Sequence, residues 1–198
     1  MKAADKLSAL RIILAPVFFI IYFIPQWNPA GIAERFPGMS VWSVPVLWLI
    51  FAASAFSDMF DGMVARRRNE VSDFGKLFDP FTDTLAQLTY FLCFVLDGFF
   101  PALLYIVILY REFGILFLRN LMLKKGTAMG ARVSGKIKTV AYISACALAL
   151  LALGIRRTKF AGGFEALAST AALAVFVVSA ALAVFSFVDY LSVYRREK

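Results

Sequence analysis

The 198-residue sequence predicts an all-α membrane protein, a bundle of six transmembrane helices, and two observations support this prediction. Hydrophobic residues make up 61% of the chain and charged residues only 17%, whereas a typical soluble domain is about 45–50% apolar and about 25% charged. The apolar residues also form six long runs, each near the roughly 20 residues that a helix needs to cross a bilayer. We therefore expect one integral membrane domain over residues 1–198.

The six runs are separated by polar, basic or turn-forming segments. The first run contains Arg11 and Pro16 and is followed by no small-residue cleavage site, so we expect a membrane helix there rather than a cleaved signal peptide. The dipeptide Asp97-Gly98 predicts a tight turn between the third and fourth runs. The expected spans are residues 10–24, 41–60, 77–96, 99–123, 139–155 and 164–188.

The basic residues predict the orientation of these spans, because short cytoplasmic loops are enriched in Lys and Arg. With six spans, most of the basic groups fall on one side, which we expect to be the cytoplasm, together with both termini. The opposite side carries Arg35 and the group Arg156, Arg157 and Lys159, which is an exception to the pattern. The formal net charge of +8 indicates contact with anionic headgroups or phosphates rather than with nucleic acid.

Acidic residues are concentrated in the stretch "SDMFDGMVARRRNEVSDFGKLFDPFTD", at the expected cytoplasmic edge. Charges beside lipid are costly and usually functional. On a helix, Asp58 and Asp61 are three positions apart and Ala65 follows four later, so the three share a face. Gly62, which has no side chain, lies beside that face. The end of the second span therefore presents two acids with open space next to them.

The start of the third span has a similar arrangement. Asp79 and Asp83 are four positions apart, again on one helix face, and Gly75 lies one turn before Asp79. We expect Pro80 in the first turn of this helix, where its missing N–H costs little. Two antiparallel helices joined here would direct four carboxylates toward one another.

Four such carboxylates would repel one another and take up protons unless cations were bound. Oxygen ligands suit Mg²⁺ or Mn²⁺, and Ca²⁺ also fits them. The chain has no histidine, and Cys93 and Cys146 lie in apolar runs, which argues against zinc. Two alternatives stay open from the residues alone: single aspartates can cap helices or pair with arginine, and intramembrane acids also occur in divalent-cation transporters.

The pattern Asp58-x-x-Asp61-Gly62-x-x-Ala65-Arg66, then eight residues, then Gly75-x-x-x-Asp79-x-x-x-Asp83 resembles the complete signature of the CDP-alcohol phosphotransferase family. The resemblance implies a six-helix membrane enzyme, a homodimer, that cleaves a CDP-linked donor and transfers its phosphate-bearing group to an alcohol. It also implies two Mg²⁺ or Mn²⁺ ions per site. By resemblance, the metal ligands are Asp58, Asp61, Asp79 and Asp83, with Asp83 as the general base, and the CDP-binding residues are Gly62, Ala65, Arg66 and Gly75.

The fourth and fifth spans carry the candidate residues for the acceptor. Arg111 and Arg119 are eight positions apart, about two helical turns, and so share a face. Lys136 and Lys138 open the fifth span. Such a basic group suits an acceptor that bears a phosphate. We therefore expect these four residues to bind the acceptor phosphate. Two alternatives stay open: the lysines can simply follow the enrichment of basic residues in cytoplasmic loops, and Arg111 can form a structural ion pair with Glu112.

Three segments resemble the bacterial phosphatidylglycerophosphate synthase branch of the family: "KLSALRIILAP", Arg111-Glu112 with Arg119, and "GKIKT" at residues 135–139. This implies transfer from CDP-diacylglycerol to glycerol 3-phosphate, giving phosphatidylglycerol phosphate and CMP, in the bacterial inner membrane among its lipids. Thr84 stands where that branch commonly has lysine. The alternatives keep the chemistry but change the substrate: inositol phosphate or serine as acceptor, or CDP-choline or CDP-ethanolamine as donor to diacylglycerol.

Overall fold

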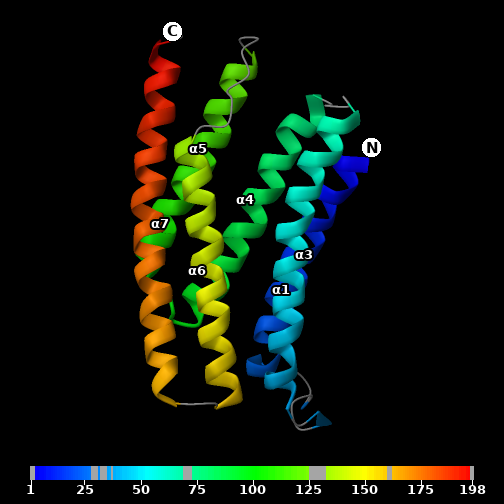
Figure 1. Ribbon diagram of the computed structural model, residues 1–198, viewed down its shortest axis with the longest axis vertical. Coiled ribbons are helices and arrows are strands. Elements are labelled where there is room, and N and C mark those ends of the chain that lie inside the picture. Colours follow the sequence, from blue (N-terminus) through cyan, green and yellow to red (C-terminus); the bar gives the residue numbers. More distant parts are fainter. Residues whose placement is uncertain are drawn as a thin grey trace. The chain divides into compact units, whose positions relative to one another are not determined.

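The computed structural model describes residues 3–27, 31, 35–36, 38–68, 73–124, 133–159 and 162–196. Within these residues the chain forms six long helices and no strand, which confirms the all-α prediction (Figure 1). The helices are α1 (Ala3–Trp27), α3 (Met39–Arg68), α4 (Asp73–Leu96), α5 (Ala102–Lys124), α6 (Val133–Thr158) and α7 (Gly162–Arg196).

Several helices continue well beyond the apolar runs that predicted them. Helix α3 extends to Arg68, so the whole first half of the acidic signature is helical. Helix α4 begins at Asp73, four residues before the expected span. Pro80 consequently lies inside α4, and its predicted place in the first turn is wrong because residues 73–76 extend the helix.

Four helices are long and apolar enough to cross a membrane, among the residues that the structure describes. They are α1, α3, α6 and α7. Large apolar side chains on these helices face outward, for example Trp42, which is 73% exposed, and Leu49, which is 70% exposed. Outward apolar surface of this kind is stable in lipid and costly in water. The chain is therefore a membrane protein.

The described helices form two compact units, and unit 1 comprises Met1–Cys93 and Leu150–Glu165. Helix α1 packs against α3 (Figure 1). Aromatic rings join both to α4: the Phe18 and Tyr90 ring centroids are 4.6 Å apart, and Phe51 lies edge-on to Tyr90 at 5.8 Å. Aromatic contacts of this geometry stabilise a core beyond their buried area. They fix α1 beside α4, which positions the residues of the candidate site.

The basic group at the end of α6 has partners within unit 1. The Arg157 guanidinium donates to the Ser43 hydroxyl at 2.5 Å and to the Tyr22 carbonyl at 2.6 Å. It also lies 5.1 Å from the centroid of the Tyr22 ring, a cation–π distance. Arg156 forms an ion pair with Glu165 at 2.8 Å. Arg156 and Arg157, part of the exception to the charge pattern, therefore connect helices rather than being unpaired loop charges.

Unit 2 comprises Phe94–Ala149 and Ala166–Lys198 and contains α5, α7 and most of α6. It begins with the predicted tight turn, which is confirmed: Gly98 has φ +79° and its N–H donates to the Val95 carbonyl at 3.1 Å. Phe100 then stacks on Phe176 of α7, with ring centroids 4.0 Å apart and planes within 2°. The turn and this stack connect the start of α5 to α7.

Gly114→Ala is expected to lower the stability of unit 2. A Cβ at residue 114 would lie 2.8 Å from Phe187 Cε2 and 3.3 Å from its Cζ, and Phe187 packs against a buried cluster that includes Tyr190. Overpacking of this kind typically costs about 1–3 kcal/mol. Thermal unfolding in detergent measures the effect. Gly163→Ala, where a Cβ meets nothing within 4 Å, is the matched control, and equal melting temperatures for the two variants would contradict the prediction.

Candidate active site

The first half of the acidic signature lies on the last turns of α3. Asp58, Asp61, Gly62, Ala65 and Arg66 all fall within the helix Met39–Arg68. Their side chains lie outside the described part of the structure. The prediction that Asp58 and Asp61 share a face requires a helix at these positions, and the backbone is helical there.

The second half of the signature lies on α4 of the same unit, and its side chains contact α1. The Ser8 hydroxyl donates to Asp79 Oδ1 at 2.5 Å. The Arg11 guanidinium forms an ion pair with Asp83 Oδ1 and donates a second hydrogen bond to Ser8 Oγ at 3.3 Å. Arg11 and Ser8 thus join the two acids in a chain of hydrogen bonds.

The hydrogen-bonded side chains of Arg11 and Asp83 differ sharply in solvent exposure. The Arg11 side chain is 2% exposed and Asp83 is 40% exposed. Gly75, one turn before Asp79, is buried. Arg11 therefore contacts Asp83 from inside the bundle, while part of the Asp83 side chain stays exposed.

These acids suit a hard divalent cation in their chemistry. The contacts to Ser8 and Arg11 engage Oδ1 of Asp79 and Asp83, and a carboxylate offers a second oxygen to other ligands. The described side chains include no group of three residues able to hold a metal. The other two predicted ligands, Asp58 and Asp61, have side chains outside the described part of the structure.

Two of the four residues predicted for the acceptor phosphate lie in a buried ion network of unit 2. Glu112 of α5, 6% exposed, accepts from Arg111 Nη1 at 2.8 Å, from Lys138 Nζ at 2.7 Å and from the Tyr142 hydroxyl at 2.9 Å. We call Arg111, Glu112, Lys138 and Tyr142 the Glu112 network. It joins α5 to α6 and contains two cations for one carboxylate, which is an excess of one positive charge.

Arg111 also connects the Glu112 network to α7. Its Nε donates to the Ala183 carbonyl at 3.2 Å, and its Nη2 donates to the Ser186 hydroxyl. Each nitrogen of the Arg111 guanidinium thus has a hydrogen-bond partner inside the bundle. The predicted alternative, an ion pair of Arg111 with Glu112, is present in the structure.

The other two predicted cations are more accessible. Lys136 is exposed in the first turn of α6, and Arg119 is half-buried near the end of α5. Arg119 lies 5.8 Å from the centroid of the Tyr190 ring and 3.5 Å from its hydroxyl. A cation that is only partly engaged can still bind an anion from outside the bundle.

Residues of α7 contribute contacts that sequence reasoning missed. Besides Ser186 and Tyr190, Asp189 accepts a hydrogen bond from Ser134 at 2.8 Å. The signal was available, because a carboxylate near the end of an otherwise apolar helix usually has a specific partner. The segment "KLSALRIILAP" contains Ser8 and Arg11, but its resemblance predicts no contact for them. The sequence predicts Glu112 as a partner of Arg111 alone, whereas the structure adds Lys138 and Tyr142.

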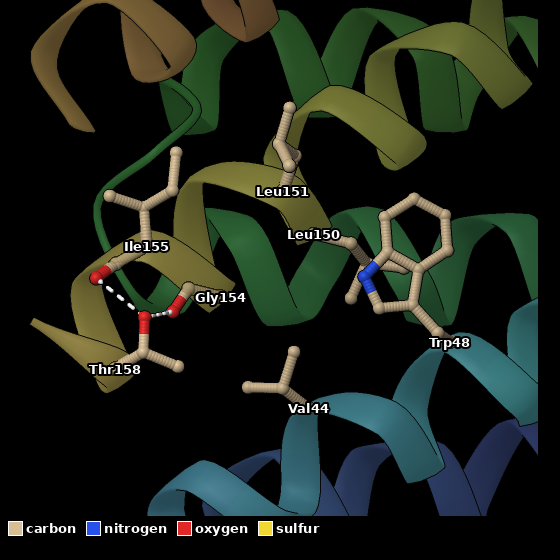
Figure 2. Close-up of a pocket in the computed structure, with 7 residues that line it drawn as sticks. All are labelled: Val44, Trp48, Leu150, Leu151, Gly154, Ile155 and Thr158. Atoms are coloured by element: carbon tan, nitrogen blue, oxygen red, sulfur yellow. Dashed lines mark hydrogen bonds between the residues drawn. The ribbon is translucent and has the colours of Figure 1, made fainter. Parts of the chain in front are cut away.

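An apolar pocket of unit 1 lies between α3 and α6 (Figure 2). It has a volume of about 350 Å³. Its one hydroxyl, on Thr158, already donates to backbone carbonyls of its own helix, at 2.8 Å to Gly154. No charged residue and no predicted site residue lines it, so it does not suit a phosphate. The lining residues are Val44, Trp48, Leu150, Leu151, Gly154, Ile155 and Thr158.

Comparison with known proteins identifies similar chains over almost the whole length. Residues 1–185 match the family model described as CDP-alcohol phosphatidyltransferase. A Treponema pallidum protein named CDP-diacylglycerol–glycerol-3-phosphate 3-phosphatidyltransferase is 38% identical, over 98% of this chain and 89% of its own. Two proteins with the same name are also similar. The one from Bacillus subtilis is 34% identical, over 74% of this chain and 75% of its own, and the one from Escherichia coli strain K12 is 30% identical, over 96% of this chain and 93% of its own.

Proposed function

Since the chain belongs to the CDP-alcohol phosphatidyltransferase family, we propose that it transfers the phosphatidyl group of CDP-diacylglycerol to glycerol 3-phosphate and releases CMP. The observation that carries the proposal is the 38% identity to the Treponema pallidum protein of that name, over 98% of this chain. The signature on α3 and α4 supports the donor half of the reaction. The excess positive charge near α5 and α6 supports a phosphorylated acceptor.

Asp83 is the proposed general base. Its 40% exposure leaves a face open to the acceptor hydroxyl. A base within hydrogen-bond reach takes the proton as the hydroxyl oxygen attacks. The new bond forms between that oxygen and the phosphorus that bears diacylglycerol, and the bond from this phosphorus to the CMP oxygen breaks.

Divalent cations, Mg²⁺ or Mn²⁺, are proposed to be held by the four aspartates Asp58, Asp61, Asp79 and Asp83. When bound, they supply charge neutralisation for the leaving phosphate. Near them, Gly62, Ala65 and Gly75 are proposed to leave room for the CDP group, and Arg66 to offer a guanidinium fork to a phosphate.

The acceptor phosphate is proposed to contact Lys136 and Arg119 directly. Arg111 and Lys138 are proposed to act from within the Glu112 network, where their hydrogen bonds go to Glu112, Ser186 and Ala183. Their combined charge with Glu112 is +1, which favours an anionic acceptor over a neutral one.

We further propose that the protein is a homodimer in a bacterial inner membrane, with both termini and the active site on the cytoplasmic side. The basic residues near the chain ends and between the expected spans support this orientation. The partners of Arg156 and Arg157 support it too, because these two charges have structural roles on the other side.

Purified protein is expected to release CMP from CDP-diacylglycerol when glycerol 3-phosphate and Mg²⁺ are both present. Inositol phosphate and serine are tested in place of glycerol 3-phosphate as alternative acceptors. This comparison is needed because Thr84 stands where the phosphatidylglycerophosphate synthase branch commonly has lysine. CMP is measured by chromatography and the lipid product by mass. Absence of CMP release with glycerol 3-phosphate, or faster release with another acceptor, would contradict the proposed acceptor.

A further inference from the structure

Helix α1 contributes two polar residues to the candidate active site, and neither belongs to the acidic signature. Ser8 and Arg11 are three positions apart and so share a face of α1. Asp79 and Asp83 are four positions apart on the facing side of α4. Ser8 contacts the first of these acids and Arg11 contacts the second.

Each acid receives a contact from α1 on one of its carboxylate oxygens. Ser8 donates to Oδ1 of Asp79, and Arg11 donates to Oδ1 of Asp83. Because Arg11 also donates to Ser8 Oγ at 3.3 Å, the order of donation runs from Arg11 through Ser8 to Asp79. Each of the two carboxylates therefore accepts a hydrogen bond from a residue of α1.

Burial distinguishes this arrangement from an ion pair that only stabilises the fold. A buried ion pair is favourable only when both partners are well satisfied, yet here the arginine is 2% exposed and its acid 40% exposed. Unit 1 holds another arginine, Arg157, whose guanidinium donates to the Ser43 hydroxyl and the Tyr22 carbonyl.

We infer that Arg11 and Ser8 are positioning residues of the transfer reaction: Arg11 orients the Asp83 carboxylate toward the acceptor hydroxyl, and Ser8 orients Asp79 for cation binding. This inference rests on the proposed function. Partners that orient metal ligands typically change affinity or activity by about 10–100-fold when removed. A small misplacement of a reacting group can cost about 10²-fold in rate.

The test compares Arg11→Gln, Arg11→Lys and Ser8→Ala with the wild-type protein. Arg11→Gln is expected to lower kcat by about 10²-fold with KM for both substrates within about threefold. Arg11→Lys should recover part of this loss, because the ammonium can still donate to Asp83. Ser8→Ala is expected to weaken Mn²⁺ binding by about 10-fold, measured by electron paramagnetic resonance without substrates.

Arg157→Gln is the matched control, since it removes a guanidinium of the same unit whose contacts go to Ser43 and Tyr22 rather than to Asp79 or Asp83. It is expected to lower the melting temperature in detergent but to leave kcat per folded molecule unchanged. Arg11→Gln with wild-type kcat would overturn the inference, as would an Arg11→Gln defect confined to Mn²⁺ binding. The proposed function fails separately, if the wild-type protein releases no CMP with glycerol 3-phosphate.

Discussion

Asp83→Asn is expected to abolish turnover while much of the divalent-cation binding survives. The amide keeps an oxygen that can coordinate a cation, but it does not accept a proton at neutral pH. Loss of a general base typically costs about 10²–10⁴-fold in rate. CMP release measures the rate, and Mn²⁺ binding measured without substrates reports on the cation site.

Asp79→Ala provides the contrast, because it removes both carboxylate oxygens. It is expected to lose Mn²⁺ binding and CMP release together. Folding is checked in both variants by thermal unfolding in detergent. Near-wild-type turnover by Asp83→Asn would show that another group takes the proton, and full Mn²⁺ binding by Asp79→Ala would remove this residue from the cation site.

Glu112→Leu is expected to be the most destabilising single change in unit 2. It leaves Arg111 and Lys138 buried without their shared carboxylate, and it removes the acceptor of the Tyr142 hydroxyl. Removing one partner of a buried ion pair typically costs about 3–5 kcal/mol, because an uncompensated charge stays behind. The melting temperature in detergent and the yield of folded protein measure the effect.

The double variant Glu112→Leu with Lys138→Met separates charge from packing. It removes one acid and one base, while Arg111 keeps the Ser186 hydroxyl and the Ala183 carbonyl. We expect it to be clearly more stable than Glu112→Leu alone, as replacement of both buried ion partners by apolar groups is often tolerated. If Glu112→Leu unfolds at the wild-type temperature, the Glu112 network is not a source of stability.

Much of the fold could be predicted because apolar run length reports directly on membrane helices. The ends were harder to predict, since polar residues continue a helix beyond the apolar run without changing its hydrophobic signal. Helix α4 illustrates this: the prediction began at residue 77, whereas the helix begins at Asp73. The position of Pro80 was wrong for the same reason.

The candidate site was predictable where its residues share one helix. The spacing of Asp79 and Asp83 requires only helical periodicity. The contacts of Arg11 and Arg111 depend instead on which helices pack together: Arg11 lies 72 positions from Asp83, and Arg111 lies 75 positions from Ser186. Sequence spacing carries no information at such separations. The assigned roles of the signature and acceptor residues remain predictions.

The Glu112 network also bears on how the chain enters the bilayer during synthesis. Helix α5 brings a guanidinium and a carboxylate at residues 111 and 112, whereas Lys138 and Ser186 belong to helices translated later. Charged side chains are costly in lipid until they find partners. We therefore expect α5, after it leaves the ribosome, to stay at the protein-conducting channel until α6 and α7 have been made. The helices α5, α6 and α7 would then enter the lipid phase as a group.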